Sequence, residues 1–173
     1  YLPGGKEQTA GNYQPDWMLL SYKKPVTVSS SLDGYPAENT VDEDSRTAWV
    51  AASNKADEWL QVDLQKLFSI QAIQVNFDEY GANQRGFVPN VYQSYLISAS
   101  ANGKDWYPVV DYSTKKTDTP HDYIEFEAPF KARYIKLQNK EYTVSPNLSV
   151  RDLRIFGNGL GSKPRAVNGF TVE

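Results

Sequence analysis

The feature that most constrains the fold is a succession of short segments rich in β-branched and aromatic residues, separated by turn residues. Antiparallel sandwiches and barrels are built from such segments, because each strand needs an apolar face and a turn that reverses the chain. Long helical periodicity is missing, so the sequence predicts an all-β domain. Eight segments fit: Val26–Ser30, Trp59–Leu64, Ser69–Phe77, Tyr95–Ser100, Trp106–Asp111, Tyr123–Phe126, Ala132–Asn139 and Val150–Phe156.

Local signals support this pattern of strands and turns. Along Trp59–Leu64, apolar residues at even positions form one face of the expected strand, and the residues at odd positions form its more solvent-exposed face. Asn102-Gly103 lies between two of the segments and predicts a tight hairpin, because both residues tolerate a positive φ. Pro36 suits the first position of a helical turn, and one short turn there is the only helix that we expect.

Composition narrows the class of protein. A chain of 173 residues fits one domain with short extensions. It carries 18 Lys and Arg against 21 Asp and Glu, with no long basic run, so nucleic acid is a poor candidate partner. No apolar stretch approaches the roughly 20 residues that span a bilayer. The absence of cysteine excludes thiol catalysis, Cys-ligated zinc and disulfides, and it favours a bacterial source.

Both ends of the chain look foreign to the expected sandwich. We assign residues 1–24 to a lead-in from a missing upstream domain; its apolar run Trp17–Leu20 must be covered, either by this domain or by that one. Residues 158–173 begin as a Gly-rich linker and then turn apolar at Phe170 and Val172, as the first strand of another domain would. The expected domain therefore spans residues 25–157.

Five blocks in the chain resemble, in the same order, the discoidin or coagulation-factor C-type domain: Ala37–Trp49, Glu58–Leu64, Tyr95–Trp106, Ala132–Leu137 and Leu153–Gly157. This resemblance implies a jelly-roll-like, galactose-binding-domain-like β-sandwich of about eight antiparallel strands. The family includes sugar-binding modules, such as family 32 carbohydrate-binding modules, and eukaryotic adhesion and lipid-binding domains.

The flanking segments resemble parts of larger enzymes. Pro15–Pro25 is similar to the stretch that links a family 43-like glycoside hydrolase domain to its C-terminal discoidin module, and Pro164–Glu173 is similar to the opening of a fibronectin-type III module. The resemblance implies an accessory module of a secreted, periplasmic or cell-surface bacterial enzyme that degrades plant or host polysaccharide. Such a module either binds carbohydrate or buttresses the catalytic domain.

The loop Asp42–Thr47 crowds hard oxygen ligands into one turn. Calcium takes six to eight oxygens, and a tight loop supplies both carboxylate and backbone oxygens. The resemblance implies a structural calcium ion here, held by the Asp42 side chain, the Thr47 hydroxyl and carbonyl groups, the Asn39 and Asp44 carbonyl groups, and Asp152 from the last strand. The alternative is that these acids merely cap a turn.

Aromatic residues divide into core and candidate ligand residues. Trp49, Trp59 and Trp106 lie inside the matched blocks, so we expect them in the core. A sugar site needs aromatic and hydrogen-bonding groups on strand-connecting loops. The candidates are Tyr35, Asp78, Asn83, Arg85, Phe87, Tyr92, Tyr142 and Asn147. The alternative is that these loops pack against a catalytic domain or a neighbouring chain.

The sequence offers little for catalysis. His121 is the only histidine and follows a proline in a polar loop, so we interpret it as a surface residue. Glycosidases need two carboxyl groups about 5–9.5 Å apart, and the adjacent pairs Glu43/Asp44 and Asp78/Glu79 should diverge. We therefore expect a non-catalytic module. The alternative function is adhesion or binding to a membrane surface, although a net charge of −3 gives no attraction to anionic lipid.

Overall fold

The computed structural model describes residues 17–81 and 90–160, and within them the chain forms eight strands and one 3-10 helix. The elements are β1 (Met18–Leu19), β2 (Val26–Val28), η1 (Ala37–Thr40), β3 (Trp49–Val50), β4 (Trp59–Phe77), β5 (Gln93–Ser100), β6 (Tyr107–Tyr112), β7 (His121–Tyr142) and β8 (Ser149–Gly159). Every strand pairing is antiparallel, which confirms the all-β prediction.

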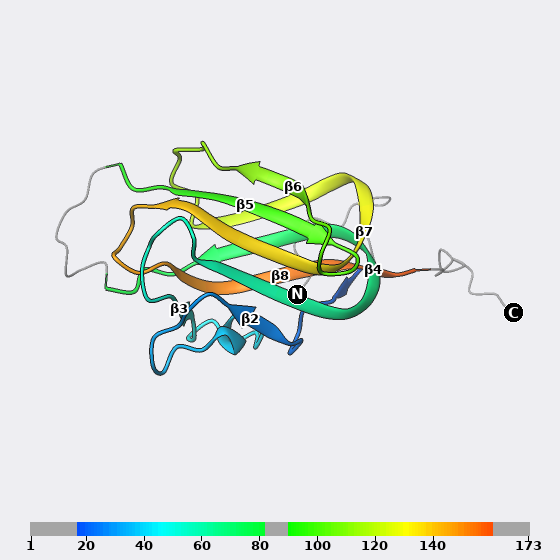
Figure 1. Cartoon of the computed structure of the whole chain (residues 1–173), viewed down its shortest axis with the longest axis horizontal. Helices are drawn as coiled ribbons and strands as arrows, with labels where there is room; N and C mark the ends of the chain where they lie inside the picture. The colour runs from blue at the N-terminus through cyan, green and yellow to red at the C-terminus, as the bar shows by residue number, and fades with distance from the viewer. Residues whose placement is uncertain (1–16, 82–89, 161–173) are drawn as a thin grey trace, which may run out of the picture.

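Two long strands, β4 and β7, each run through both layers of the sandwich and bend at one end of it (Figure 1). The pairing of β4 with β7 is interrupted between Asp63 and Phe68, and Gln65 there has a φ of 76°. This irregularity lets the strand turn from one sheet into the other. Two pairs of the expected strands are therefore continuous strands, because the predicted breaks between them are bends and not loops.

The two layers share these long strands. The front sheet has the order β2–β4–β7–β5–β6 and uses the first half of β4 with the second half of β7. The back sheet has the order β7–β4–β8–β1 and uses the other halves, and β3 pairs with the start of β8. The chain thus closes a sandwich around one core.

The core lies between the two sheets and follows the alternation of the strands. Along the first part of β4, buried residues alternate with partly exposed ones, as the sequence predicts. The largest side chains that are fully buried include Trp49, Tyr95, Tyr142 and Phe156. The prediction that Trp49 belongs to the core is confirmed, and its indole Nε1 donates to the Ser30 carbonyl group at 2.9 Å.

The C-terminal part of the expected lead-in, residues 1–24, contacts the sandwich itself. Met18 and Leu19 form β1, which pairs with Gly157 and Phe156 of β8 at the edge of the back sheet. Leu20 is 3% exposed and belongs to the core. The apolar run Trp17–Leu20 thus packs on this domain through Leu20, whereas Met18 remains 48% exposed. Residues 1–16 lie outside the described residues.

Connections between strands gather at two ends of the sandwich (Figure 1). We call one the loop end; its described connections are 29–35, 51–58, 78–81, 90–92, 113–120 and 143–148. The bends of β4 and β7 and the β5–β6 hairpin lie at the opposite end. No helix in the described ranges is long and apolar enough to cross a membrane.

Candidate functional site

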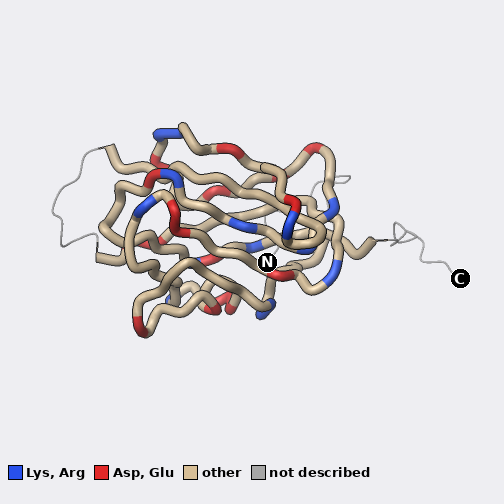
Figure 2. Tube along the Cα trace, in the orientation of Figure 1, with Lys and Arg blue, Asp and Glu red and all other residues tan. Residues whose placement is uncertain are grey.

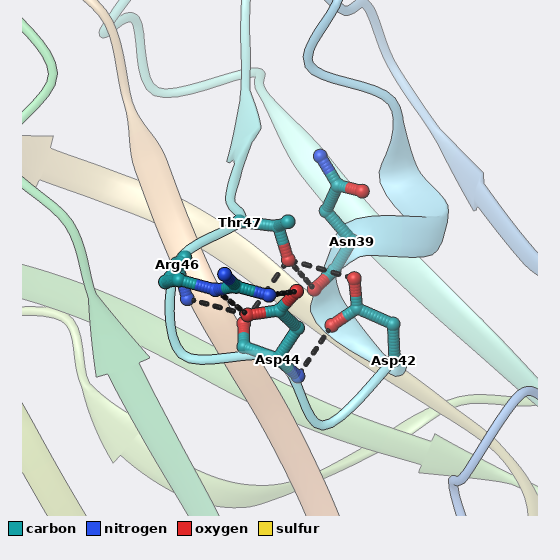
Figure 3. A network of polar contacts seen from close by, with 5 residues as sticks. All are labelled: Asn39, Asp42, Asp44, Arg46 and Thr47. Atoms are coloured by element: carbon teal, nitrogen blue, oxygen red, sulfur yellow. Dashed lines mark hydrogen bonds and ion pairs between the residues drawn. The ribbon is translucent and has the colours of Figure 1, made fainter.

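The first candidate site is the loop Asp42–Thr47, which follows η1 and returns the chain into β3. Its oxygens converge on the Thr47 hydroxyl group (Figure 3). Thr47 Oγ1 lies 2.7 Å from Asp42 Oδ2, 3.1 Å from the Asp44 carbonyl oxygen and 3.5 Å from the Asn39 carbonyl oxygen. Four predicted ligand residues therefore meet at one point.

This cluster has more oxygens than protons. A threonine hydroxyl carries one hydrogen, so it can donate to one of these three acceptors at a time. The other oxygens keep lone pairs that face the same point, and a hard cation stabilises such a set. The described residues hold no group of three or more acidic, histidine or cysteine side chains arranged for a metal. A cation here would therefore depend on backbone and hydroxyl oxygens together with the Asp42 carboxylate.

The fifth predicted ligand residue, Asp152, lies on β8 and is 8% exposed. Its Oδ2 accepts a hydrogen bond from Asn76 Nδ2 at 3.0 Å, across the back sheet. Burial raises the pKa of Asp152, and the nearby charge of Glu43 raises it further. No hydrogen bond between described residues joins Asp152 to Asp42, Asp44 or Thr47. Asp152 thus lies close enough to the loop for the charge of Glu43 to act on it, but it is not part of the oxygen cluster around Thr47.

A bidentate ion pair ties the loop to the back sheet. Glu43 has a φ of 57°, and its carboxylate accepts from Arg154 Nε at 2.9 Å and from Arg154 Nη2 at 2.8 Å. Arg154 lies on β8 with only 13% of its side chain exposed, and it also donates to Gln74 on β4 at 3.0 Å. This pair could not be predicted from the sequence, because its members are far apart in the chain.

The second candidate site lies at the loop end. The rings of Tyr35 and Tyr80 meet edge to face with centroids 5.0 Å apart, and both side chains are half-buried. We call them the tyrosine pair. Two residues before Tyr80, the Asp78 carboxylate forms an ion pair with Arg151 at the start of β8. Neither Tyr80 nor Arg151 is among the candidates that the sequence predicts, and Arg151 lies inside a strand and not in a connecting loop.

Tyr142 is a core residue, contrary to the prediction that it faces a ligand. It is 2% exposed, and its ring packs on Phe77 with centroids 5.9 Å apart. Its hydroxyl group donates to the Asp78 carbonyl oxygen, and burial raises its pKa. The residue ends β7 on the inward face of the strand, so it supports the loop that carries Asp78 from beneath.

Two other predicted sugar-site residues, Asn147 and Tyr92, make their contacts away from the tyrosine pair. Asn147 donates to the Ala51 carbonyl oxygen at 2.9 Å and braces two loops. The ring of Tyr92 lies 4.7 Å from Lys116 Nζ, which also binds Glu141 at 2.6 Å. Three more predicted residues, Asn83, Arg85 and Phe87, lie outside the described residues.

Trp59 and Trp106 are not core residues, so their assignment to the core was wrong. Both are half-buried on the outer face of the front sheet, with Lys136 Nζ 5.2 Å from the Trp59 ring and 4.6 Å from the Trp106 ring. Trp59 alternates with buried Leu60, so it must face outward. Membership of a matched sequence block did not distinguish the two faces of the sheet.

The described side chains supply no arrangement for acid–base catalysis around the residues that the sequence raised. His121 is exposed, and its Nδ1 lies 3.1 Å from the Asn76 side-chain oxygen. Glu43 turns to Arg154, whereas Asp44 binds Arg46 at 3.0 Å. These neighbouring carboxyl groups thus diverge, as expected.

Comparison with known proteins decides the family. The model of the F5/8 type C domain matches residues 25–152. The chain belongs to the F5/8 type C domain family. The resemblance on which the sequence analysis rested is therefore confirmed, and the sandwich is the fold of this family.

One curated relative of this F5/8 type C domain is a lactadherin. Lactadherin of Rattus norvegicus is 33% identical over 110 residues, which are 60% of this chain and 25% of that protein. The chain thus spans about a quarter of the length of this curated relative.

Solved structures share the F5/8 type C fold at lower sequence identity. Chitosan-binding module 2 of a Paenibacillus chitosanase/glucanase, in complex with chitotriose, matches with a TM-score of 0.67 and 21% identity, over 80% of this chain and 99% of that one. A family 89 glycoside hydrolase of Clostridium perfringens matches with a TM-score of 0.66 and 19% identity, over 86% of this chain and 16% of that one.

Proposed function

We propose that this F5/8 type C domain is a carbohydrate-binding module without catalytic activity of its own, and that the tyrosine pair is the centre of its ligand surface. The observation that carries the proposal is the pair itself. Tyr35 and Tyr80 come from two different connections of the loop end and meet at 5.0 Å, each with part of its ring exposed. Such rings offer an apolar surface to the C–H face of a sugar, and their hydroxyl groups remain able to hydrogen-bond.

The surroundings of the pair supply directional polar groups. Asp78 and Arg151 form an ion pair with side chains 26% and 33% exposed. Each retains hydrogen-bonding capacity toward solvent, because a carboxylate offers about four lone-pair sites and a guanidinium group five donors. The buried hydroxyl group of Tyr142 holds the backbone of Asp78 in place. The site therefore combines a rigid support with aromatic and polar groups, as sugar sites require.

The proposed context is a secreted bacterial enzyme that degrades polysaccharide. The similarity of Pro15–Pro25 to the link after a family 43-like hydrolase domain supports this parent. The family 89 hydrolase shows that a sandwich of this fold occurs as a small part of a longer hydrolase chain. In the same context, the module would buttress the catalytic domain if it bound no glycan.

We further propose a structural calcium ion in the Asp42–Thr47 loop. The convergence of Asp42 Oδ2 and the Asn39 and Asp44 carbonyl oxygens on Thr47 Oγ1 supports this assignment. Bound calcium would supply positive charge that satisfies these lone pairs at once. Asp152 would join the ligands if its side chain turned from Asn76 toward the loop.

Binding to a membrane surface is the alternative function, and two observations disfavour it. The exposed large apolar side chains of the described residues are Met18, Tyr22, Leu67, Tyr107 and Leu160, none of which lies in the connections of the loop end. In the view of Figure 2, Lys and Arg are interspersed with Asp and Glu along the described chain. Within residues 17–81 and 90–160, insertion of apolar loop tips and attraction to anionic lipid therefore both lack support.

Affinity electrophoresis in native gels tests the proposal. We expect the domain to be retarded by at least one neutral plant or host polysaccharide, and Tyr80→Ala to weaken retention about tenfold, because a central aromatic contact contributes more than about 1 kcal/mol. Tyr22→Ala is the matched control, since Tyr22 is 48% exposed and lies elsewhere. Retention by no glycan, with co-sedimentation on liposomes instead, would establish the membrane alternative.

A further inference from the structure

The outer face of the front sheet carries a lysine between two tryptophans. Lys136 Nζ lies 4.6 Å from the centroid of the Trp106 ring and 5.2 Å from that of Trp59. Trp106 also approaches the ring of Tyr134, with centroids 6.4 Å apart. We call these four residues the tryptophan–lysine face. Trp59, Tyr134 and Lys136 lie on strands and Trp106 directly precedes β6, away from the loop end, so the proposed sugar site leaves this face without a function.

Strand alternation fixes the direction of these side chains. Lys136 alternates with the buried residues Ile135 and Leu137, so it points away from the core. Its neighbours across the front sheet are Gln61 on β4 and Ser98 on β5, and both are neutral. The lysine therefore has two neutral cross-strand neighbours and two indole rings near it, while Asp63 on the same face of β4 is already bound by Arg133.

Lys136 lacks the carboxylate partner that four other half-buried cations have, and it shares this lack with Lys24 and Lys140 among the described residues. Arg133, Arg151 and Arg154 each bind an acid, and so does Lys115. Among the described residues, no acid lies within 4 Å of Lys136, which therefore has only aromatic partners there. An ammonium group has three donors, and contact with π faces leaves them free to bind an anion.

A second unpaired cation extends this face along β7. Lys140 lies on the same side of the strand, and it forms no ion pair within the described part of the chain. At about 3.3 Å per residue, it stands roughly 13 Å from Lys136. Asp111 interacts electrostatically with Lys140 but forms no ion pair with it. The Oδ1 atom of Asp111 accepts a hydrogen bond from the Ser113 hydroxyl group at 2.6 Å. The face thus presents two ammonium groups and exposed aromatic surface in one line.

We propose that the tryptophan–lysine face is a second glycan-binding surface, specific for polysaccharides that carry carboxylates, such as uronate polymers. The indole rings pack on the apolar faces of sugar residues, while Lys136 and Lys140 bind carboxylates along the polymer. An extended polymer that lies along β7 can contact both lysines at once. This surface is independent of the tyrosine pair and does not rest on the sugar site proposed there.

The experiment uses affinity electrophoresis with polygalacturonate as the probe and fully methyl-esterified pectin as its uncharged counterpart. We expect polygalacturonate to retard the domain, the esterified polymer to retard it much less, and added salt to reduce retention. Lys136→Gln should weaken binding at least fivefold, whereas Lys136→Arg, which keeps the charge, should retain it. Lys55→Gln removes an equal charge from the loop end and is the control.

Three results separate the alternatives. Tyr80→Ala should leave binding of polygalacturonate unchanged, so that failure of the loop-end site and failure of this one are distinguishable. If Lys136→Gln lowers the melting temperature, Lys140→Gln provides the same test without disturbing the tryptophans. Equal retention of wild type, Lys136→Gln and Lys140→Gln, or no retention of wild type, would show that Lys136 has only a structural role between the two indoles.

Discussion

The Asp42–Thr47 loop and the loop end are both polar regions made by connections between strands, yet their charges are organised differently. In the loop, several oxygens meet around one hydroxyl proton. At the loop end, Asp78 is paired with Arg151, Lys115 with Asp122 and Lys116 with Glu141. In the loop, Glu43 and Asp44 are paired with Arg154 and Arg46, whereas the Asp42 carboxylate has no ion-pair partner among the described residues. We conclude that the Asp42 carboxylate is suited to a cation, whereas the paired charges of Asp78 and Arg151 are suited to a neutral ligand.

The largest expected effect concerns the support of the loop end. Tyr142→Ala should destabilise the domain by about 3–5 kcal/mol, because it removes a fully buried ring from the core. Tyr142→Phe keeps that ring and loses one hydrogen bond to Asp78, which contributes about 1 kcal/mol. Chemical denaturation measures both changes. Unaltered stability of the alanine variant would place Tyr142 in a ligand site after all.

Removal of calcium should have the next largest effect. If calcium is present at a hundredfold excess over its dissociation constant, it stabilises the folded state by about 2.7 kcal/mol. For a domain of this size, that corresponds to a change in melting temperature of roughly 5–10 °C. Differential scanning calorimetry with and without EDTA measures it. Asp42→Asn should abolish the response, and an unchanged melting temperature in wild type would contradict the calcium assignment.

A buried carboxylate at the loop end gives a pH dependence. Glu58 is 6% exposed and accepts hydrogen bonds from the hydroxyl groups of Ser29, Ser30 and Ser53. Burial alone would raise the pKa of Glu58, but these hydrogen bonds outweigh it and lower the pKa below its usual value. The stabilisation from Glu58 is therefore complete above the unfolded pKa and is lost as the pH falls through the folded one.

The variant Glu58→Gln tests this pH dependence. We expect it to cost about 1–3 kcal/mol at pH 7 and progressively less towards pH 3, because the wild type then loses the same interaction. Urea denaturation across this range measures the difference. A cost that did not change with pH would show that the hydroxyl groups do not favour the ionised carboxylate.

The smallest effect tests the link between the calcium loop and the back sheet. Glu43→Gln removes the charge that Arg154 binds, and we expect a loss of about 1 kcal/mol together with several-fold weaker calcium binding, because the loop is less well held. Isothermal titration calorimetry measures the affinity. Glu141→Gln breaks an exposed pair with Lys116 and should change neither quantity.

These two regions also differ in how far the sequence predicted them. Asp42, Asp44 and Thr47 are close in the sequence, so one short loop brings them together and their convergence was predictable. The tyrosine pair and Arg151 come from three separate segments, and their proximity depends on how the sheets pack. Tyr142 was misassigned because its position after a long strand did not reveal which face it occupies. The positions of the strands could be predicted from the alternation of apolar and polar residues. The bends of β4 and β7 could not, because the alternation does not show whether a strand ends or bends.

The most direct test of the account is to map a retained neutral oligosaccharide onto the domain by the changes it causes in backbone amide NMR shifts. The account predicts large changes at Tyr35, Asp78 to Tyr80 and Arg151, and none at Asp42 to Thr47. Changes centred on the Asp42–Thr47 loop, or an absence of changes around the tyrosine pair, would contradict the assignment of the loop end as the glycan-binding surface.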